Sequence, residues 1–104
     1  MKWGAYCETF GATPRNRIME VFLTGRSLEF SQEDIVEETT LPKVVVASMM
    51  AKITKKGHVI ATRALKGKQL YRLNKEHKDV KLFLKAYDAI LHTIVEEYNE
   101  KIVA

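Results

Sequence analysis

The sequence predicts an α+β fold that is mostly helical, in a single domain of 104 residues. Three observations lead to this prediction. Several segments carry apolar residues three and four positions apart, which is the spacing of a helix with one buried face. Two short alternating runs flank Lys66-Gly67, as in a β-hairpin. A long apolar stripe with helical spacing then fills the C-terminal quarter of the chain.

The first helix is expected to begin at Thr13-Pro14, with Thr13 as the N-cap and Pro14 in the first helical position. Its apolar side includes Ile18 and Phe22, and Gly25 ends it. The alternating residues 28–30 then predict a short strand.

Ser31 followed by Asp34 resembles an N-cap with an acid in the first turn, and it predicts a helix of about eight residues. A turn follows at residues 39–42, because a proline disfavours helix in the residue before it. A third helix is expected from about residue 43 to 56, ending at Gly57. Its inward face would carry Val46, Met50 and Ile53.

Residues 59–65 and 69–73 are expected to pair as a hairpin around Lys66-Gly67. From about residue 78 to 102 the helical pattern returns. A helix of about 24 residues is about 36 Å long, which exceeds what so small a body can cover. Its apolar stripe therefore requires a partner.

This order of elements is that of a winged helix-turn-helix with a long C-terminal dimerisation helix. The second and third helices would form the helix-turn-helix, and the hairpin would be the wing. We expect residues 13–77 to form this core and residues 78–103 to form the dimerisation helix.

Charge divides the chain into three parts. Residues 43–85 carry twelve Lys or Arg against two acids, a net charge of +10, whereas residues 1–42 and 86–104 each carry −3. A basic middle between acidic ends is expected when one surface meets a polyanion such as DNA. A solvated lysine-rich face is the alternative interpretation.

Three stretches resemble archaeal winged helix-turn-helix transcriptional regulators of the broad ArsR/MarR-like superfamily. They are "FGATPRNRIMEVFL", "LPKVVVASMMAKITKKGHVIATR" and "GKQLYRLNKEHKDVKLFLKAYDAIL", and the resemblance covers roughly residues 10 to 95. It implies a homodimer that binds double-stranded DNA, with the third helix in the major groove and the wings along the backbone. The chain departs from the family in that helix, where valines replace the usual Ser, Thr and Arg.

The candidate DNA-binding residues lie on the predicted third helix and on the wing. On the helix, the valines can contact thymine methyl groups and the serine can contact either base type, while the lysines reach phosphates. The wing cations flank a glycine that permits close approach to the DNA backbone. The set is Lys43, Val44, Val45, Ser48, Lys52, Lys55, Arg63, Lys66 and Lys68. The alternative for the helix is that Val44 and Val45 pack on another protein. The alternative for the wing is an ordinary hairpin whose edge is protected by lysines.

The candidate dimer interface is the stripe on the long helix, formed by Phe83, Tyr87, Ile90, Ile94 and Tyr98. An alternative has this helix folding back on its own domain against Trp3 and Tyr6. Arg15 and Arg17 lie at the unfavourable end of the first helix for a cation. Either a DNA phosphate or an ion pair with Glu20 or Glu8 would explain them.

No cofactor, metal site or small-molecule effector is predicted. Cys7, His58, His77 and His92 show no ligand spacing along the sequence, and a lone cysteine has no resolving partner for a redox switch. No Ser/His/Asp grouping, phosphate-binding glycine loop or acid pair indicates an enzyme. The N-terminus lacks the apolar centre of a signal peptide and no run is long enough to span a membrane, so a cytoplasmic, nucleoid-associated location is expected.

The function predicted from sequence is therefore a dimeric, sequence-specific, double-stranded DNA-binding regulator of transcription. Two alternatives stay open. The valines of the third helix also suit non-specific, chromatin-type DNA binding, and its apolar face also suits a winged-helix module that binds another protein.

Overall fold

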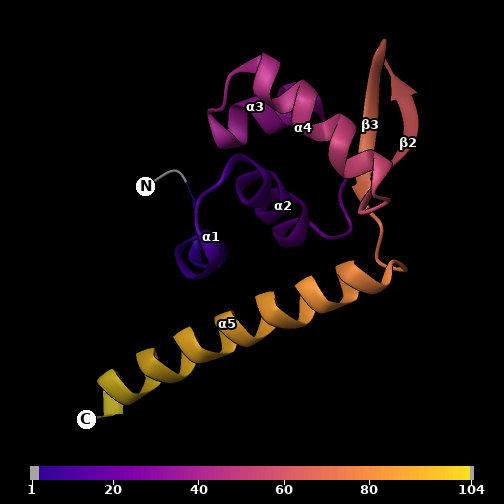
Figure 1. Ribbon diagram of the computed structural model, residues 1–104. Helices are drawn as coiled ribbons and strands as arrows, with labels where there is room; N and C mark the ends of the chain where they lie inside the picture. The colour runs from indigo at the N-terminus through magenta and orange to yellow at the C-terminus, as the bar shows by residue number, and fades with distance from the viewer. Residues whose placement is uncertain (1–2, 104) are drawn as a thin grey trace.

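The computed structural model describes residues 3–103 and consists of five helices and a small antiparallel sheet (Figure 1). Within that range the elements are α1 (Ala5–Phe10), α2 (Pro14–Thr24), β1 (Phe30–Ser31), α3 (Gln32–Thr39), α4 (Lys43–Lys55), β2 (Val59–Leu65), β3 (Lys68–Leu73) and α5 (Lys78–Val103). The four predicted helices and the hairpin are confirmed. Helix α1 was not predicted.

Local signals explain where these elements begin and end. The Thr13 hydroxyl accepts a hydrogen bond from the Asn16 backbone N–H at 3.1 Å. Ser31 and Asp34 form a reciprocal capping box at the start of α3. The hairpin turn is a two-residue connection in which both Lys66 (φ 53°) and Gly67 (φ 77°) have positive φ. This geometry matches the right-handed twist of the strands.

The core lies where α2, α3 and α4 meet the sheet. Val46, Met50 and Ile53 of α4 are buried, as the sequence predicted. They pack with side chains from the other elements: Ile18, Met19, Phe22, Leu23, Ile35, Leu41, Val59, Leu73 and Val80. Helix α4 therefore buries one face in the core and exposes the opposite face to solvent.

The sheet has the strand order β1-β3-β2, and both pairings are antiparallel. Strand β1 pairs with β3 through Phe30 and Tyr71. The pairing of β2 with β3 is interrupted between Ala61 and Ala64. At this interruption the Thr62 hydroxyl and the Arg63 guanidinium both donate to the Glu29 carboxylate. The hairpin is thereby tied to the segment that precedes β1.

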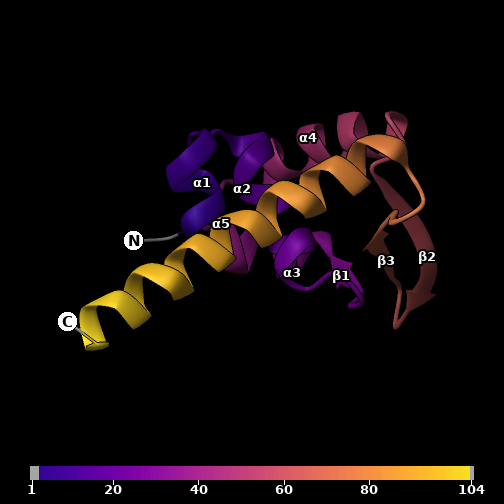
Figure 2. The same ribbon diagram turned by 90° about the horizontal axis from the view of Figure 1, so that it is seen from below.

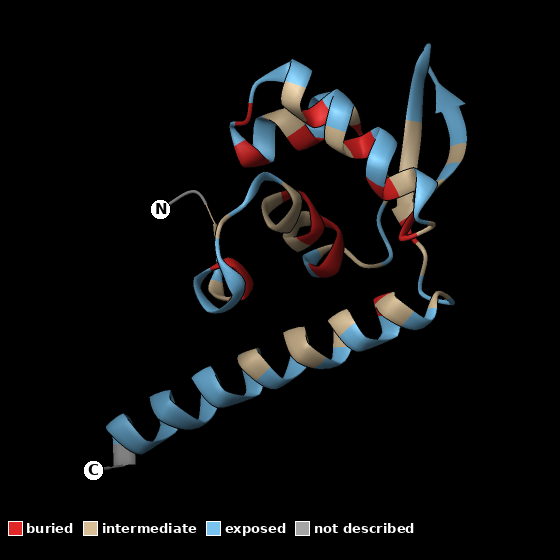
Figure 3. Ribbon diagram, in the orientation of Figure 1, coloured by how far each residue is buried: buried red, intermediate tan, exposed pale blue. Residues whose placement is uncertain are grey.

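The first half of α5 packs on its own domain, and the second half extends beyond it (Figures 1 and 2). Val80 is buried, and Phe83, Leu84, Tyr87 and Ile90 are half-buried against the core. From residue 91 to 102 every side chain is exposed (Figure 3). No helix within residues 3–103 combines the length and the apolar character needed to cross a membrane.

Phe83, Tyr87 and Ile90 of the predicted dimer face thus pack in part on their own domain, and the dimer interface stays a prediction. The Tyr87 hydroxyl lies 2.8 Å from Thr24 Oγ1, and its ring lies 6.4 Å from that of Tyr6. These contacts confirm, for the first half of α5 and for Tyr6, the alternative in which the helix folds back on its own domain. The Trp3 ring lies beneath the guanidinium of Arg17, 5.3 Å from ring centroid to Cζ.

Candidate nucleic-acid interface

The outer face of α4 carries most of the residues predicted to meet DNA. Val44 is 80% exposed, and Lys43, Ser48, Lys52 and Lys55 are exposed with it. Val45 differs from the prediction because it is half-buried and packs on the core. Three consecutive residues of a helix span about 200° around its axis, so the three valines cannot all share one face. Val44 is thus the outward valine, and Val45 is a packing residue.

The β2–β3 hairpin, predicted to be a wing, carries less unpaired positive charge than its sequence suggests. Lys68 Nζ lies 2.6 Å from Glu33 Oε2, and Arg63 Nη2 lies 3.2 Å from Glu29 Oε1. The hydrogen bond and charge of Lys68 lower the pKa of Glu33, while those of Glu33 raise the pKa of Lys68. Each acid is therefore ionised and each cation is paired at neutral pH.

Lys66 is exposed at the tip of the turn and forms no ion pair within residues 3–103. Its place beside Gly67, whose side of the turn is open, lets the tip approach a flat or concave surface closely. Of the three predicted wing cations, Lys66 is the one positioned to meet a phosphate without breaking an internal contact.

A groove of about 430 Å³ separates α4 from the hairpin. Its lining is neutral apart from one lysine and consists of Gln32, Ala47, Met50, Ala51, Thr54, Lys55, Ala61, Gln69 and Tyr71. Two amide side chains, Gln32 and Gln69, therefore lie beside the exposed face of α4. Sequence analysis missed both, because only the tertiary fold brings the start of α3 and strand β3 next to α4.

The side chains of Arg15 and Arg17 make contacts within their own domain. Arg15 Nη2 lies 2.5 Å from His58 Nδ1, and its guanidinium lies over the Phe83 ring. Arg17 donates to the Thr39 carbonyl oxygen. Of the two explanations offered for these arginines, the ion pair with Glu20 or Glu8 does not form among residues 3–103. Glu20 instead accepts hydrogen bonds from the backbone N–H groups of residues 4 and 7, and Glu8 accepts one from the Trp3 indole.

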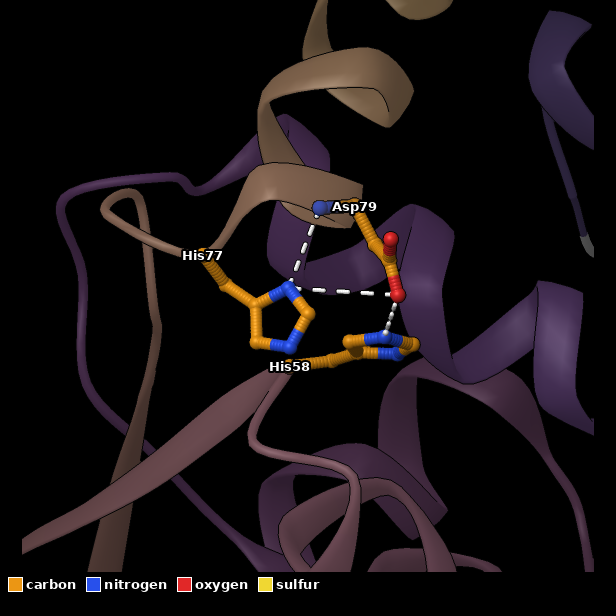
Figure 4. Close-up of side chains that lie close together, drawn as sticks. All are labelled: His58, His77 and Asp79. Atoms are coloured by element: carbon orange, nitrogen blue, oxygen red, sulfur yellow. Dashed lines mark hydrogen bonds and ion pairs between the residues drawn. The ribbon is translucent and has the colours of Figure 1, made fainter.

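A separate cluster lies where the base of the hairpin meets the start of α5 (Figure 4). His58 Nε2 lies 3.0 Å from Asp79 Oδ2, and His77 Nδ1 lies 3.9 Å from the same oxygen. The Asp79 backbone N–H donates to His77 Nδ1 at 3.0 Å. Burial lowers the pKa of His58, and the hydrogen bond from His58 lowers the pKa of Asp79.

Sequence spacing gave no sign of this cluster, because residues 58 and 77 come together only through the hairpin between them. The other two candidates lie elsewhere. Cys7 is buried in α1. His92 lies on the exposed half of α5, 2.9 Å from Glu96.

No family model matches the chain, and no curated protein matches it. A crystal structure of Rv0081 from M. tuberculosis is similar in fold, with a TM-score of 0.58 over 89% of this chain and 88% of that one. The two sequences are 16% identical over this match. The likeness therefore concerns the arrangement of the whole chain rather than a shared site.

Proposed function

We propose that the protein is a winged helix-turn-helix regulator of transcription that binds double-stranded DNA as a homodimer. In this proposal α3 and α4 are the helix-turn-helix, α4 enters the major groove, and the β2–β3 hairpin is the wing. The observation that carries the proposal is the division of α4 into two faces. The inner face is buried in the core, and the outer face presents Val44, Ser48, Lys52 and Lys55 beside a basic hairpin tip.

In this proposal, base reading is the task of a few side chains. Val44 contacts thymine methyl groups, and Ser48 donates to or accepts from a base edge. Lys43, Lys52, Lys55 and Lys66 contact phosphates, which position the protein without reading sequence. Gln69 adds an amide oxygen at the groove between α4 and the hairpin that can accept a hydrogen bond from a base, while its Nε2 donates to the backbone carbonyls of Arg63 and Leu70.

The C-terminal half of α5 supplies the proposed dimer contact. Leu91, Val95, Tyr98 and Ile102 follow one another at spacings of four, three and four, so they form one stripe, with Ile94 beside it. All five are exposed, and Tyr98 is 63% exposed. Ile94 and Tyr98 belong to the interface predicted from sequence as well. Leu91, Val95 and Ile102 take the place of Phe83, Tyr87 and Ile90, which pack on their own domain.

Selection from a randomised duplex pool, carried out at two salt concentrations, tests the proposal. An enriched sequence with two-fold symmetry is the expected result, because two α4 helices related by a dimer axis read symmetric half-sites. Binding without enrichment would instead support a non-specific architectural role, and no binding would support a protein-binding module. A Ser48→Ala, Val44→Ala double variant should lose the enrichment and stay folded, since both changes lie on the exposed face of α4.

A further inference from the structure

The proposed DNA-binding surface leaves the cluster of His58, His77 and Asp79 unexplained (Figure 4). Two of these residues sit at the start of α5, and the third lies just before β2. One potential ligand atom from each lies within 4.8 Å of the others. The cluster therefore gathers two imidazoles and one carboxylate from segments about twenty residues apart.

We propose that His58, His77 and Asp79 bind one divalent transition-metal ion of the zinc class, with water completing the coordination. Imidazole nitrogen and carboxylate oxygen are ligands that suit Zn²⁺, Co²⁺ and Ni²⁺. Metal–ligand bonds of about 2.1 Å hold two ligand atoms of one ion no more than about 4.2 Å apart. The separations of 3.0 and 3.9 Å already meet this limit, and an ion bound at His77 Nδ1 would displace the hydrogen bond that this atom accepts from the Asp79 backbone N–H.

Small side-chain movements are enough to bring the ligand atoms of His58 and His77, which lie within 4.8 Å of each other, inside the same limit. The His58 side chain is 4% exposed, and its ring is held edge-on by the rings of His77 and Phe83. The side chains of His77 and Asp79 are 23% and 42% exposed, so these two have room to adjust around a fixed His58. Their exposure also gives an ion a route from solvent.

Arg15 donates a hydrogen bond to His58, and the loss of this hydrogen bond would mark metal binding. Because Arg15 donates to His58 Nδ1, the single ring proton lies on Nε2, where it faces Asp79. A metal that takes the Nε2 lone pair moves this proton to Nδ1, which then faces the Arg15 donor. Metal binding therefore releases Arg15 from His58, so a contact between α2 and the hairpin base is lost, while the existing contact between His58 and Asp79 is replaced by a link through the ion.

Titration of the full chain with Co²⁺, followed by visible absorption and by competition with Zn²⁺, tests this site. One ion per chain is expected, with an absorption spectrum typical of nitrogen and oxygen ligands. His77→Asn keeps a side chain able to cap α5 but removes the imidazole, and it should weaken Co²⁺ binding at least about tenfold. Asp79→Asn should do the same, and Arg15→Met should tighten binding.

His92→Ala is the matched control, because this histidine is exposed on α5 away from the cluster. Circular dichroism establishes that each variant is folded. Equal Co²⁺ affinity in the wild-type chain, His77→Asn and Asp79→Asn would overturn the proposal, as would the absence of any binding at millimolar Co²⁺. Neither outcome depends on DNA binding, so the metal site and the proposed function fail or stand separately.

Discussion

Lys68 Nζ lies 2.6 Å from Glu33 Oε2, so a cation of the hairpin is paired with an acid in the first turn of α3. Arg63 is paired with Glu29 in the same way. Exposed pairs of this kind contribute little to stability, because water and salt screen them. Their larger effect is to lower the positive electrostatic potential that DNA would meet at the hairpin, because each acid lies beside a hairpin cation that the sequence predicted to bind DNA.

Glu33→Gln should strengthen DNA binding several-fold at low salt. The change frees Lys68 and removes a negative charge beside the proposed contact surface. The dependence of log K on log salt should steepen by about 1 for each phosphate that Lys68 then contacts. Fluorescence anisotropy at a series of salt concentrations measures both effects. Glu100→Gln makes the same charge change on the far half of α5, and an equal gain there would contradict the prediction.

Lys66→Gln should weaken binding to all DNA sequences to a similar degree and flatten the salt dependence by about 1 for each phosphate that the lysine no longer neutralises. Lys68→Gln should have a smaller effect, because that lysine is already paired with Glu33. The double change of Lys66 and Lys68 should flatten the slope by between about 1 and about 2, because Lys68 adds less than Lys66. The same anisotropy series measures each slope, and an unchanged slope in the double variant would remove the hairpin from the contact surface.

Two neighbouring valines should respond differently to replacement. Val44→Ala should alter the sequences recovered from a randomised pool and leave the unfolding free energy nearly unchanged, since Val44 is exposed. Val45→Ala should lower the unfolding free energy by about 1 kcal/mol, because it removes buried methyl groups. Denaturant unfolding and pool selection on both variants separate the two roles. If Val45→Ala changed the recovered DNA sequences and Val44→Ala did not, the roles assigned to the two valines would be reversed.

Tyr98→Asp should convert the proposed dimer to a monomer without unfolding the domain. A charge at the centre of an apolar stripe is costly to bury, and Tyr98 makes no contact with the core. Light scattering coupled to size-exclusion chromatography measures the mass. Glu96→Gln lies on the same half of α5 and should leave the mass unchanged. Phe83→Ala should instead lower the unfolding free energy by about 2 kcal/mol, because that ring packs on its own domain.

The Cys7 thiol should react slowly with alkylating reagents at pH 8. Burial raises its pKa from 9.0 to about 11, so little reactive thiolate forms in the folded protein. Because the folded-state pKa is the higher one, the associated stability is present below pH 9 and is lost as the pH rises toward 11. Thiol titration with and without denaturant measures the reactivity, and equal rates would show that Cys7 is accessible.

Sequence reasoning succeeded where structure is decided by residues close along the chain. The caps at Thr13 and Ser31, and the turn at Lys66-Gly67, each depend on a few neighbouring positions. It failed where distant segments meet. The pairing of Glu29 and Glu33 with the hairpin cations needs the β1–β3 contact, which no local pattern reveals.

The apolar stripe of α5 illustrates the same limit. Helical spacing showed that one face would be covered, but it did not say by what: for Phe83, Tyr87 and Ile90 it allowed both a partner chain and the domain itself. The histidine cluster was hidden for a similar reason. Its ligands share no spacing along the chain, and the fold alone brings them together.

Helix α5 joins the base of the hairpin to the proposed dimer contact through 26 residues without a glycine or proline. Such a helix is about 39 Å long and behaves as a stiff lever. Because α5 packs on its own domain as far as Ile90, the free part is about 20 Å long, and a tilt of about 5° where it leaves the domain displaces its far end by about 2 Å. The side chains that pack α5 on the domain thus set the distance between the two DNA-binding surfaces of any dimer formed at its tip.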